Sequence, residues 1–370
     1  MKWIIREKKN KSDEFNAGSK ARLDVDKIMV SLGYNPVFIE GDIVVTKGIV
    51  NKILNHKRTY NQWKNAVKHF KRGDVVFIQL PVFNHTMFIG LLFKLLSKRG
   101  VHIIGLVHDL ESIRWALKKE VSVLRKIRYG LEETAALKKA DYVIVHNRKM
   151  MQFIHRKNKI SLDKMNGLEI FDYLYAPNRI DRASNINSPI VIAGNLSKEK
   201  SGYVYKLPST IPFNLYGANY DEKTCVDSNV NYLGVFPPDD LPDALNGCFG
   251  LVWDGPSSET CEGICGEYLR YNNPHKTSLY LASGLPVIIW DKAALSRFVK
   301  KQGVGITVGS LSEIGDKINK LSKEEYKTMV RNTEALGYKL RNGFFLKRSI
   351  SMIENEINKS VFFLNKQVKQ

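Results

Sequence analysis

The sequence has few cysteines and a shortage of acidic residues. Its 370 residues include four cysteines, all in the second half, and no two of them form a CxxC pair. A structural zinc site needs a second ligand pair, and disulfide frameworks are typical of small secreted domains. We therefore expect ordinary reduced thiols. The cysteines are Cys225, Cys248, Cys261 and Cys265.

Long hydrophobic runs are also missing. The most apolar stretch, Met87–Leu96, is interrupted by Lys94 and is far shorter than the roughly 20 residues that span a bilayer. The start, MKWIIREKKNKSDE, has only a short apolar run, which is not typical of a signal peptide. We expect a cytoplasmic protein, and contact with the inner face of the plasma membrane stays open.

Basic residues are in large excess. Lys and Arg number 57 against 37 Asp and Glu, a net charge of +20, which indicates a polyanionic partner. The stretch Lys118–Lys159 holds twelve basic and four acidic residues. It is either a solvated helical face or a patch for anionic lipid headgroups. No RNP, zinc-finger or basic-zipper pattern accompanies the charge, so nucleic acid is not an expected partner.

Short apolar strands alternate with amphipathic helices along the whole chain. Strands without polar alternation, separated by helices, predict α/β domains with parallel sheets covered on both faces. A polar stretch, Ala176–Ser188, interrupts the pattern and predicts the domain boundary. We expect an N-terminal domain at 1–178, a C-terminal domain at 189–345, and a helix at 346–370 that packs back on the first domain. The predicted strands are Lys2–Ile5, Val37–Ile39, Val75–Gln79, Val101–Leu106, Tyr142–Val145, Ile190–Ala193, Phe213–Tyr216, Phe249–Trp253, Pro286–Trp290 and Gly305–Val308.

The segment Cys248–Trp290 carries the clearest functional pattern. A strand leads into a Gly- and Ser-containing loop and then into NNPHKTSLYLASG, where Pro274 suits the first turn of a helix. The free N–H groups of that turn, together with Lys276, would favour a diphosphate. The alternative is a helix that begins with proline and carries a solvated lysine.

The same segment resembles a bacterial GT-B glycosyltransferase family that contains β-1,6-galactofuranosyltransferases and the glucosyltransferase 3 enzymes of adhesin glycosylation. The matching residues there are Pro274, Lys276, Leu281, Ala282, Gly284, Pro286, Val287 and Ile288. AGNLSK (193–198) resembles the family's GNL loop, YLGVFPPDDLP (232–242) its uracil-side segment, and FNAGSKARLD (15–24) its NAGSKA loop. The resemblance implies a GT-B fold, with two Rossmann-like domains facing a cleft.

The resemblance also implies a UDP-sugar donor bound mainly by the C-terminal half. Lys198 would meet the diphosphate, although family members can carry arginine there, and Phe236 would lie beside the uracil. Two of these residues have an alternative role without a ligand: Phe236 can fill the core, and Ser19 can cap the first helix. The donor-binding residues implied are Asn16, Gly18, Ser19, Gly194, Asn195, Lys198, Phe236, Asn273, Pro274, His275, Lys276 and Ser278.

The tetrapeptide His108–Glu111 follows a predicted strand directly, and ligands of open α/β sheets bind at the carboxyl ends of strands. Inverting transfer needs one base for the acceptor hydroxyl. Asp109 is the first candidate, Glu111 is the second, and His108 would position the acceptor or neutralise the diphosphate. The alternative for Asp109 is a helix cap.

The sequence predicts no metal cofactor, because Asp239 and Asp240 are adjacent and do not form a DxD pair. The predicted function is an inverting, metal-independent transfer of galactofuranose or glucose from a UDP-sugar to a glycan, glycolipid or glycoprotein. Two alternatives stay open: a sugar-nucleotide epimerase with a similar donor site, and a non-catalytic module that binds polyanions or membranes. The sequence leaves the transferred hexose, the linkage and a homo-oligomeric state open.

Overall fold

The computed structural model describes residues 1–7, 17–39, 48–83, 86–117, 122–123, 127–128, 130–177, 185–223 and 228–367. The chain forms two compact units. Unit 1 consists of Met1–Asp13, Val25–Leu168 and Leu346–Gln370, and unit 2 consists of Glu14–Asp24 and Glu169–Phe345. The chain enters unit 2 at Glu169, before the polar stretch in which the sequence predicts the linker.

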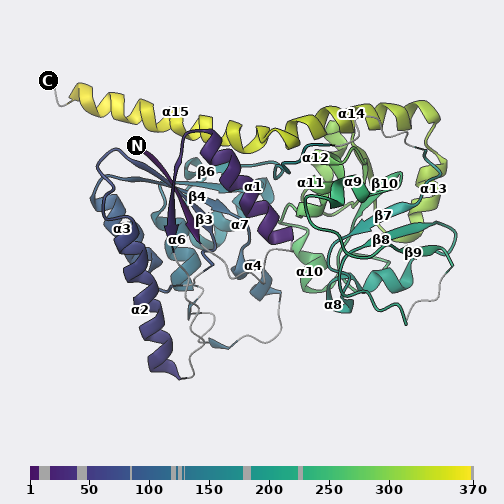
Figure 1. Cartoon of the computed structure of the whole chain (residues 1–370), viewed down its shortest axis with the longest axis horizontal. Coiled ribbons are helices and arrows are strands. Elements are labelled where there is room, and N and C mark those ends of the chain that lie inside the picture. The colour runs from purple at the N-terminus through teal and green to yellow at the C-terminus, as the bar shows by residue number, and fades with distance from the viewer. Residues whose placement is uncertain are drawn as a thin grey trace. The chain divides into compact units, whose positions relative to one another are not determined.

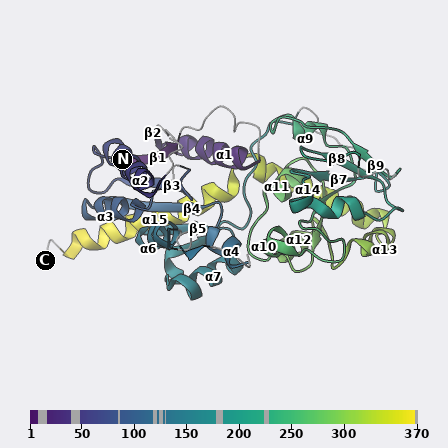
Figure 2. The same cartoon turned by 90° about the horizontal axis from the view of Figure 1, so that it is seen from below.

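Unit 1 contains a six-stranded, fully parallel sheet in the order β2-β1-β3-β4-β5-β6. Figure 2 shows its first five strands side by side in this order. The strands are β1 (Lys2–Glu7), β2 (Asn35–Ile39), β3 (Val75–Leu80), β4 (His102–Val107), β5 (Tyr142–Val145) and β6 (Met165–Gly167). The helices are α1 (Ala17–Ser31), α2 (Ile49–Ala66), α3 (Ile89–Lys98), α4 (Glu111–Ala116), α6 (Ala135–Lys139), α7 (Arg148–Asn158) and α15 (Phe344–Gln367), and α1 and α15 each begin within unit 2 (Figure 1).

Burial explains the apolar character of these strands. All six residues of β3 are buried, and Ile4, Phe77 and Ile104 are fully inaccessible to solvent. Parallel strands covered on both faces are apolar at consecutive positions, as the sequence indicates. The core therefore lies along both faces of the sheet.

Helix α15 packs on unit 1 with one apolar stripe. Ile350, Ile353 and Ile357 are spaced by three and four residues, as on one face of a helix, and all are buried. Beside them, Glu354 accepts a hydrogen bond of 2.8 Å from the Tyr34 hydroxyl and pairs with Lys2 at 2.7 Å. The end of the chain is thereby joined to β1 and to the residue before β2.

Unit 2 contains a second six-stranded parallel sheet, in the order β12-β11-β10-β7-β8-β9. Strand order reverses between β7 and β10, and ligands of doubly wound sheets bind at such a switch point. The strands are β7 (Ile190–Ala193), β8 (Phe213–Tyr216), β9 (Val230–Tyr232), β10 (Phe249–Val252), β11 (Val287–Trp290) and β12 (Gly305–Val308). The helices are α8 (Lys198–Ser201), α9 (Leu241–Ala244), α10 (Gly263–Tyr268), α11 (His275–Ala282), α12 (Ser296–Gln302), α13 (Ile314–Asn319) and α14 (Lys323–Arg341). Of the helices in the described ranges, none has the length and apolar character to cross a membrane.

Candidate active site

Beside the switch point of unit 2, the loops that follow β7 and β8 approach each other backbone to backbone. Gly194, directly after β7, has φ +134°, a conformation that favours glycine. A Cβ at Gly217, after β8, would overlap the Gly194 carbonyl oxygen. Asn195 Oδ1 accepts hydrogen bonds of 3.0 Å from the backbone N–H of Ser197 and from the Asn219 side chain. The loop predicted to meet the diphosphate is thus held in one shape.

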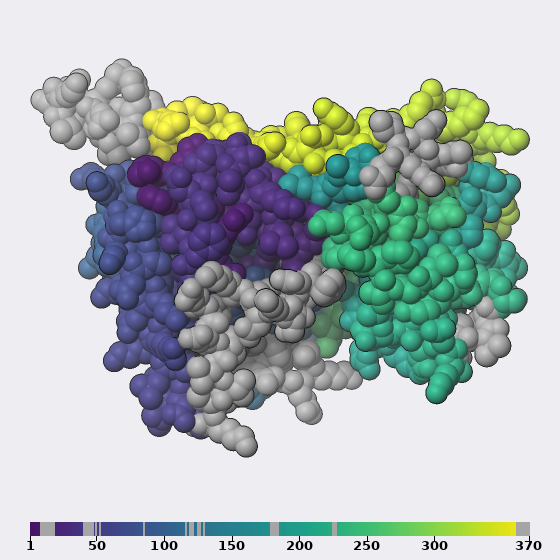
Figure 3. All heavy atoms as spheres, in the orientation of Figure 1, coloured from purple at the N-terminus to yellow at the C-terminus, as the bar shows by residue number. Residues whose placement is uncertain are grey.

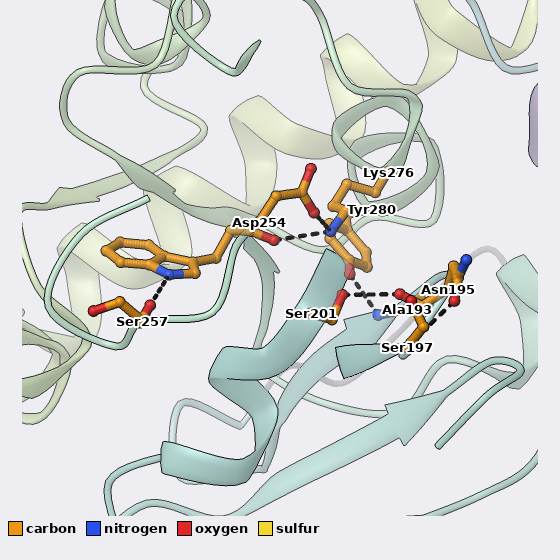
Figure 4. Close-up of polar contacts among 9 residues, drawn as sticks. Ala193, Asn195, Ser197, Ser201, Asp254, Ser257, Lys276 and Tyr280 are labelled. Atoms are coloured by element: carbon orange, nitrogen blue, oxygen red, sulfur yellow. Dashed lines mark hydrogen bonds and ion pairs between the residues drawn. The ribbon is translucent and has the colours of Figure 1, made fainter. Parts of the chain in front are cut away.

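Lys276 lies at the same switch point, in the first turn of α11 (Figure 4). Its Nζ is 2.8 Å from Asp254 Oδ1 and 3.0 Å from the Trp253 carbonyl oxygen, both just after β10. Burial lowers the pKa of Lys276, but the Asp254 carboxylate, together with Tyr280 and Cys261, raises it by more, so the pKa lies above its ordinary value. The structure therefore keeps one full positive charge at the start of α11, at 10% side-chain exposure.

Tyr280 joins α11 to both strands of the switch point. Its hydroxyl accepts the backbone N–H of Ala193 at 2.7 Å, one residue before Gly194. Its ring lies against Gly250 in β10, where a Cβ would overlap the ring. Tyr280 therefore contributes both to the position of α11 and to the shape of the loop after β7.

The NAGSKA segment (16–21) falls within the part of the chain, Glu14–Asp24, that is assigned to unit 2. Asn16 lies outside the described residues, and Gly18 and Ser19 lie within the first turns of α1, so Ser19 is not its N-cap. Lys20 is buried, and its Nζ is 2.7 Å from Asp24 and 2.9 Å from Asp239. It also donates to the Leu174 carbonyl oxygen at 2.6 Å. The start of α1 is thereby fixed to unit 2.

His275 lies beside this cluster. Its ring centroid is 5.1 Å from that of Tyr173, which in turn lies 5.0 Å below the Lys20 ammonium. Burial and, to a smaller extent, the Lys20 ammonium lower the pKa of His275 to about 4. The imidazole is therefore neutral at pH 7. Tyr173 thus lies between Lys20 and His275, which are more than 250 residues apart in sequence.

The other predicted donor residues differ in what they contact. Asn273 donates to the Glu169 carbonyl oxygen at 3.0 Å, and Ser278 donates to that of Phe171 at 2.7 Å. These contacts hold the segment where the chain enters unit 2, which is a structural role. Pro274 is the N-cap of α11, so the helix begins one residue later than the sequence predicts.

Lys198 follows β7, and Phe236 follows β9, in the same sheet. Lys198 is half exposed and pairs with Asp221 at 2.9 Å, above the ring of Tyr205. The Phe236 ring is half-buried, with its centroid 5.9 Å from that of Tyr216. Both side chains therefore have a surface that a ligand can contact.

In unit 1, the predicted catalytic residues follow β4. His108 Nε2 is 2.6 Å from Gln79 Oε1, while Gln79 Nε2 donates to Asp26 Oδ1 at 2.8 Å. Because the Gln79 oxygen is the acceptor in this chain, Nε2 of His108 carries the proton. Asp109 is 39% exposed at its side chain, and Oδ2 is 3.7 Å from Arg114. Its carboxylate is held near a positive charge but stays accessible.

His146 is a further histidine in this region, and the sequence did not single it out. It follows β5, which is the neighbour of β4 in the sheet. Burial lowers the pKa of His146 to about 4, although the nearby Asp109 carboxylate and backbone groups at His108 and Val107 raise it. The available signal was a polar residue directly after an apolar strand.

Glu133 fixes the start of α4. One of its oxygens accepts the backbone N–H of Ser112 at 3.1 Å, and Lys157 donates to the Ser112 carbonyl oxygen at 3.3 Å. The other oxygen is buried and has no hydrogen-bond partner among the described residues. Glu132 and Glu133 belong to a π-helical turn (Gly130–Thr134), and such turns are frequent at functional sites.

A small cavity lies beside these glutamates and the predicted catalytic residues. Its volume is about 30 Å³, and it is lined by Leu80, Pro81, Val82, Ile89, Val107, Asp109, Leu110, Glu111, Glu132, Glu133, Ala136 and Leu137.

Glu133→Gln should change how stability depends on pH. Burial raises the pKa of Glu133, so the folded chain keeps this proton at pH values where the unfolded chain has lost it. The free energy of unfolding therefore falls as pH rises above the ordinary value of 4.5 toward the raised folded pKa. As the pH rises across this range, the thermal midpoint of the unchanged chain should fall relative to that of Glu133→Gln. Glu324→Gln, at an exposed position, is the control, and an effect of Glu133→Gln that is constant with pH would contradict the assignment.

Within the ranges that the structure describes, no three His, Cys, Asp or Glu side chains are grouped as metal ligands. Two buried cysteines, Cys248 and Cys261, are free thiols, and burial raises the pKa of Cys248 to about 12. Asp254, Tyr280 and Lys20 make contacts that shape the candidate donor site of unit 2 but were not predicted as site residues.

Family models match both halves of the chain. Residues 1–165 match the N-terminal domain of the glucosyltransferase 3-like family, and residues 190–353 match its C-terminal domain. The β-1,6-galactofuranosyltransferase WbbI of Escherichia coli (strain K12) is 32% identical over 346 residues, which are 92% of this chain and 96% of that protein. Glucosyltransferase 3 of Streptococcus gordonii is 26% identical over 289 residues, which are 75% of this chain and 78% of that protein.

Solved structures share the fold at low sequence identity. Sucrose-phosphate synthase from Thermosynechococcus elongatus has a TM-score of 0.62 and 14% identity, covering 98% of this chain and all of that one. WaaG, a glycosyltransferase involved in lipopolysaccharide biosynthesis, has a TM-score of 0.55 and 12% identity, covering 92% of this chain and 98% of that one. With two parallel-sheet units and these relatives, the chain is a glycosyltransferase of the GT-B fold. It belongs to the glucosyltransferase 3-like family, which confirms the predicted fold class and family.

Proposed function

We propose that this enzyme transfers a hexose from a UDP-sugar to a hydroxyl group of a glycan, glycolipid or glycoprotein, with inversion and without a metal ion. Galactofuranose and glucose are the sugars named by the relatives, and they are the donors proposed here. The observation that carries the proposal is the buried, charged Lys276 at the start of α11, at the switch point of unit 2.

Unit 2 is proposed to bind the donor. A diphosphate needs positive charge and free N–H donors, and the helix start with Lys276 supplies both. The Gly194–Asn195 loop is open to close approach, since nothing lies within 4 Å of the position a Gly194 Cβ would take. Lys198 adds a second cation, and Phe236 offers a ring face to the uracil.

Unit 1 is proposed to supply the base. In the transfer, the acceptor oxygen forms a bond to the anomeric carbon, the bond from that carbon to the diphosphate oxygen breaks, and UDP leaves with the electron pair. The acceptor proton goes to Asp109, which is exposed and next to the neutral His146. His108 is held by Gln79 with its protonated nitrogen occupied, which favours a positioning role. Glu111 is the second candidate base.

Tyr280→Phe tests how far the donor loop depends on α11. Without the hydroxyl, the buried N–H of Ala193 has no acceptor, which costs about 1–3 kcal/mol of stability. We expect roughly tenfold weaker UDP binding in calorimetric titration, because the Gly194 loop loses its anchor. Tyr326→Phe is the matched control: its buried hydroxyl donates to the Cys248 carbonyl oxygen at 2.9 Å, away from this loop. It should lower the thermal midpoint similarly and leave UDP affinity intact, and equal affinity losses in both variants would contradict the assignment.

The absence of a metal requirement can be tested directly. Charge on the leaving diphosphate would be met by Lys276, Lys198 and helix-terminal N–H groups, so a chelator should not reduce turnover. UDP release from UDP-glucose and UDP-galactofuranose should be measured in EDTA, with a panel of hexose glycosides as acceptors. Acceptor-dependent release in EDTA supports the proposal. Release that needs an added divalent cation, or no release from either donor, would contradict it.

The location and partners are also proposals. The buried free thiols suit a reducing compartment, and the excess of basic residues suits contact with the anionic inner face of the plasma membrane. Such contact would bring a membrane-attached acceptor to the enzyme.

A further inference from the structure

The first turns of α2 expose an apolar face. Val50 is 71% exposed, Ile53 47% and Leu54 55%. These positions are spaced by three and four residues, so their side chains share one side of the helix. Three large aliphatic side chains grouped on a solvated surface indicate an interaction site more strongly than scattered ones do.

The rest of α2 is anchored to unit 1. Thr86 donates to the His56 carbonyl oxygen at 3.0 Å, the Tyr60 and Phe88 rings are 6.1 Å apart, and Trp63 is 1% exposed. The aromatic residues of α2 therefore face the unit. The turns before His56 reach beyond the strands of the sheet in Figure 1, and Figure 3 shows the same helix at the surface of unit 1.

The charge of α2 indicates what this face meets. The helix contains Lys52, Lys57, Arg58 and Lys64 and no acidic residue. Lys57 and Lys64 are exposed. An anionic partner is therefore favoured, and a membrane surface is the anionic partner that also accepts aliphatic side chains, because the acyl region lies directly below the headgroups. A nucleic acid would use basic residues with stacking aromatics, and the α2 aromatics are turned inward.

We propose that α2 docks unit 1 on an anionic lipid bilayer. Val50, Ile53 and Leu54 enter the boundary between headgroups and acyl chains, while Lys57 and Lys64 contact the phosphate headgroups. This inference adds a defined surface to the membrane contact proposed above, and it does not depend on the identity of the sugar donor.

The full chain should be tested by flotation with vesicles of equal parts phosphatidylglycerol and phosphatidylcholine, and with phosphatidylcholine vesicles. The variant Val50→Gln/Ile53→Gln/Leu54→Gln keeps good helix formers and should bind anionic vesicles at least about tenfold more weakly. Lys57→Gln/Lys64→Gln should lose about fivefold per charge at low salt. The matched control changes three other exposed apolar residues of unit 1, Val30→Gln/Leu162→Gln/Met352→Gln, and should bind like the unchanged chain.

Unaltered anionic-vesicle binding by the α2 variant would overturn the proposal, and so would an equal loss in the control. Equal binding to both vesicle types would overturn the headgroup contact. If the α2 variant instead lowers the mass of the chain in light scattering and keeps vesicle binding, the face is an interface between copies and the proposal is wrong. Circular dichroism and UDP titration of each variant separate misfolding and a failed donor site from a failed membrane contact.

Discussion

Replacing Lys276 with alanine should weaken UDP binding at least tenfold in calorimetric titration. Lys276 lies in the first turn of α11, and its side chain is only 10% exposed. A charge-assisted contact to phosphate in such a site contributes about 1.5–3 kcal/mol, and its loss would weaken binding at least tenfold. The change also leaves the Asp254 carboxylate buried without its partner, which costs about 3–5 kcal/mol of stability. The thermal midpoint must therefore be measured together with the affinity.

Asp254→Asn is the control that separates these two effects. It removes the same ion pair but keeps the ammonium, and an amide oxygen can still accept from Nζ at the observed 2.8 Å. We expect it to lower stability and retain UDP binding. If Lys276 serves only to pair with Asp254, both variants should lose UDP binding in proportion to their loss of stability, and that result would contradict the diphosphate contact.

Asp109→Asn should lower kcat by about two to four orders of magnitude while UDP affinity is unchanged. Asparagine has nearly the same shape as aspartate but cannot take the acceptor proton at neutral pH. The side chain is accessible and 3.7 Å from Arg114, so its replacement breaks no buried ion pair. Steady-state turnover and calorimetric titration of the same preparation provide both quantities.

Glu111→Gln is the comparison for this variant. Glu111 is 24% exposed and 3.9 Å from the same arginine, so both variants weaken the same charge cluster. We expect only a modest decrease in kcat for Glu111→Gln. Full turnover by Asp109→Asn together with a large loss in Glu111→Gln would move the base to Glu111, and full turnover by both would remove the base from this loop.

The apolar strands were the most predictable part of the fold. All ten predicted strands are present, and most of them are buried on both faces, which gives an uninterrupted apolar sequence; the edge strand β2, with Phe38 53% exposed, is an exception. The sequence missed β6 and β9, whose residues MNG and VNY carry polar side chains at sheet edges. The helical pattern that the sequence shows at Tyr60–Lys71 overlaps only the last part of α2, which spans Ile49–Ala66.

The candidate site was only partly predictable from local pattern. Lys276 and the Gly194 loop could be proposed from sequence because a helix start and a glycine after a strand have a local signature. Asp254 and Tyr280 could not be, because their contacts join α11 to the end of β10 and to the end of β7, and these elements come together only in the folded unit. Lys20 illustrates the same limit, since its partners Asp239 and Leu174 are distant in sequence.

The central claim is that unit 2 binds a uridine diphosphate through Lys276. Calorimetric titration of the full chain with UDP, ADP and GDP in EDTA tests it most directly, followed by the same titrations of Lys276→Ala. The account predicts binding of UDP in preference to the other two nucleotides, and UDP binding at least tenfold weaker in the variant. Binding of none of the three nucleotides, or UDP binding that is unchanged in Lys276→Ala, would contradict it.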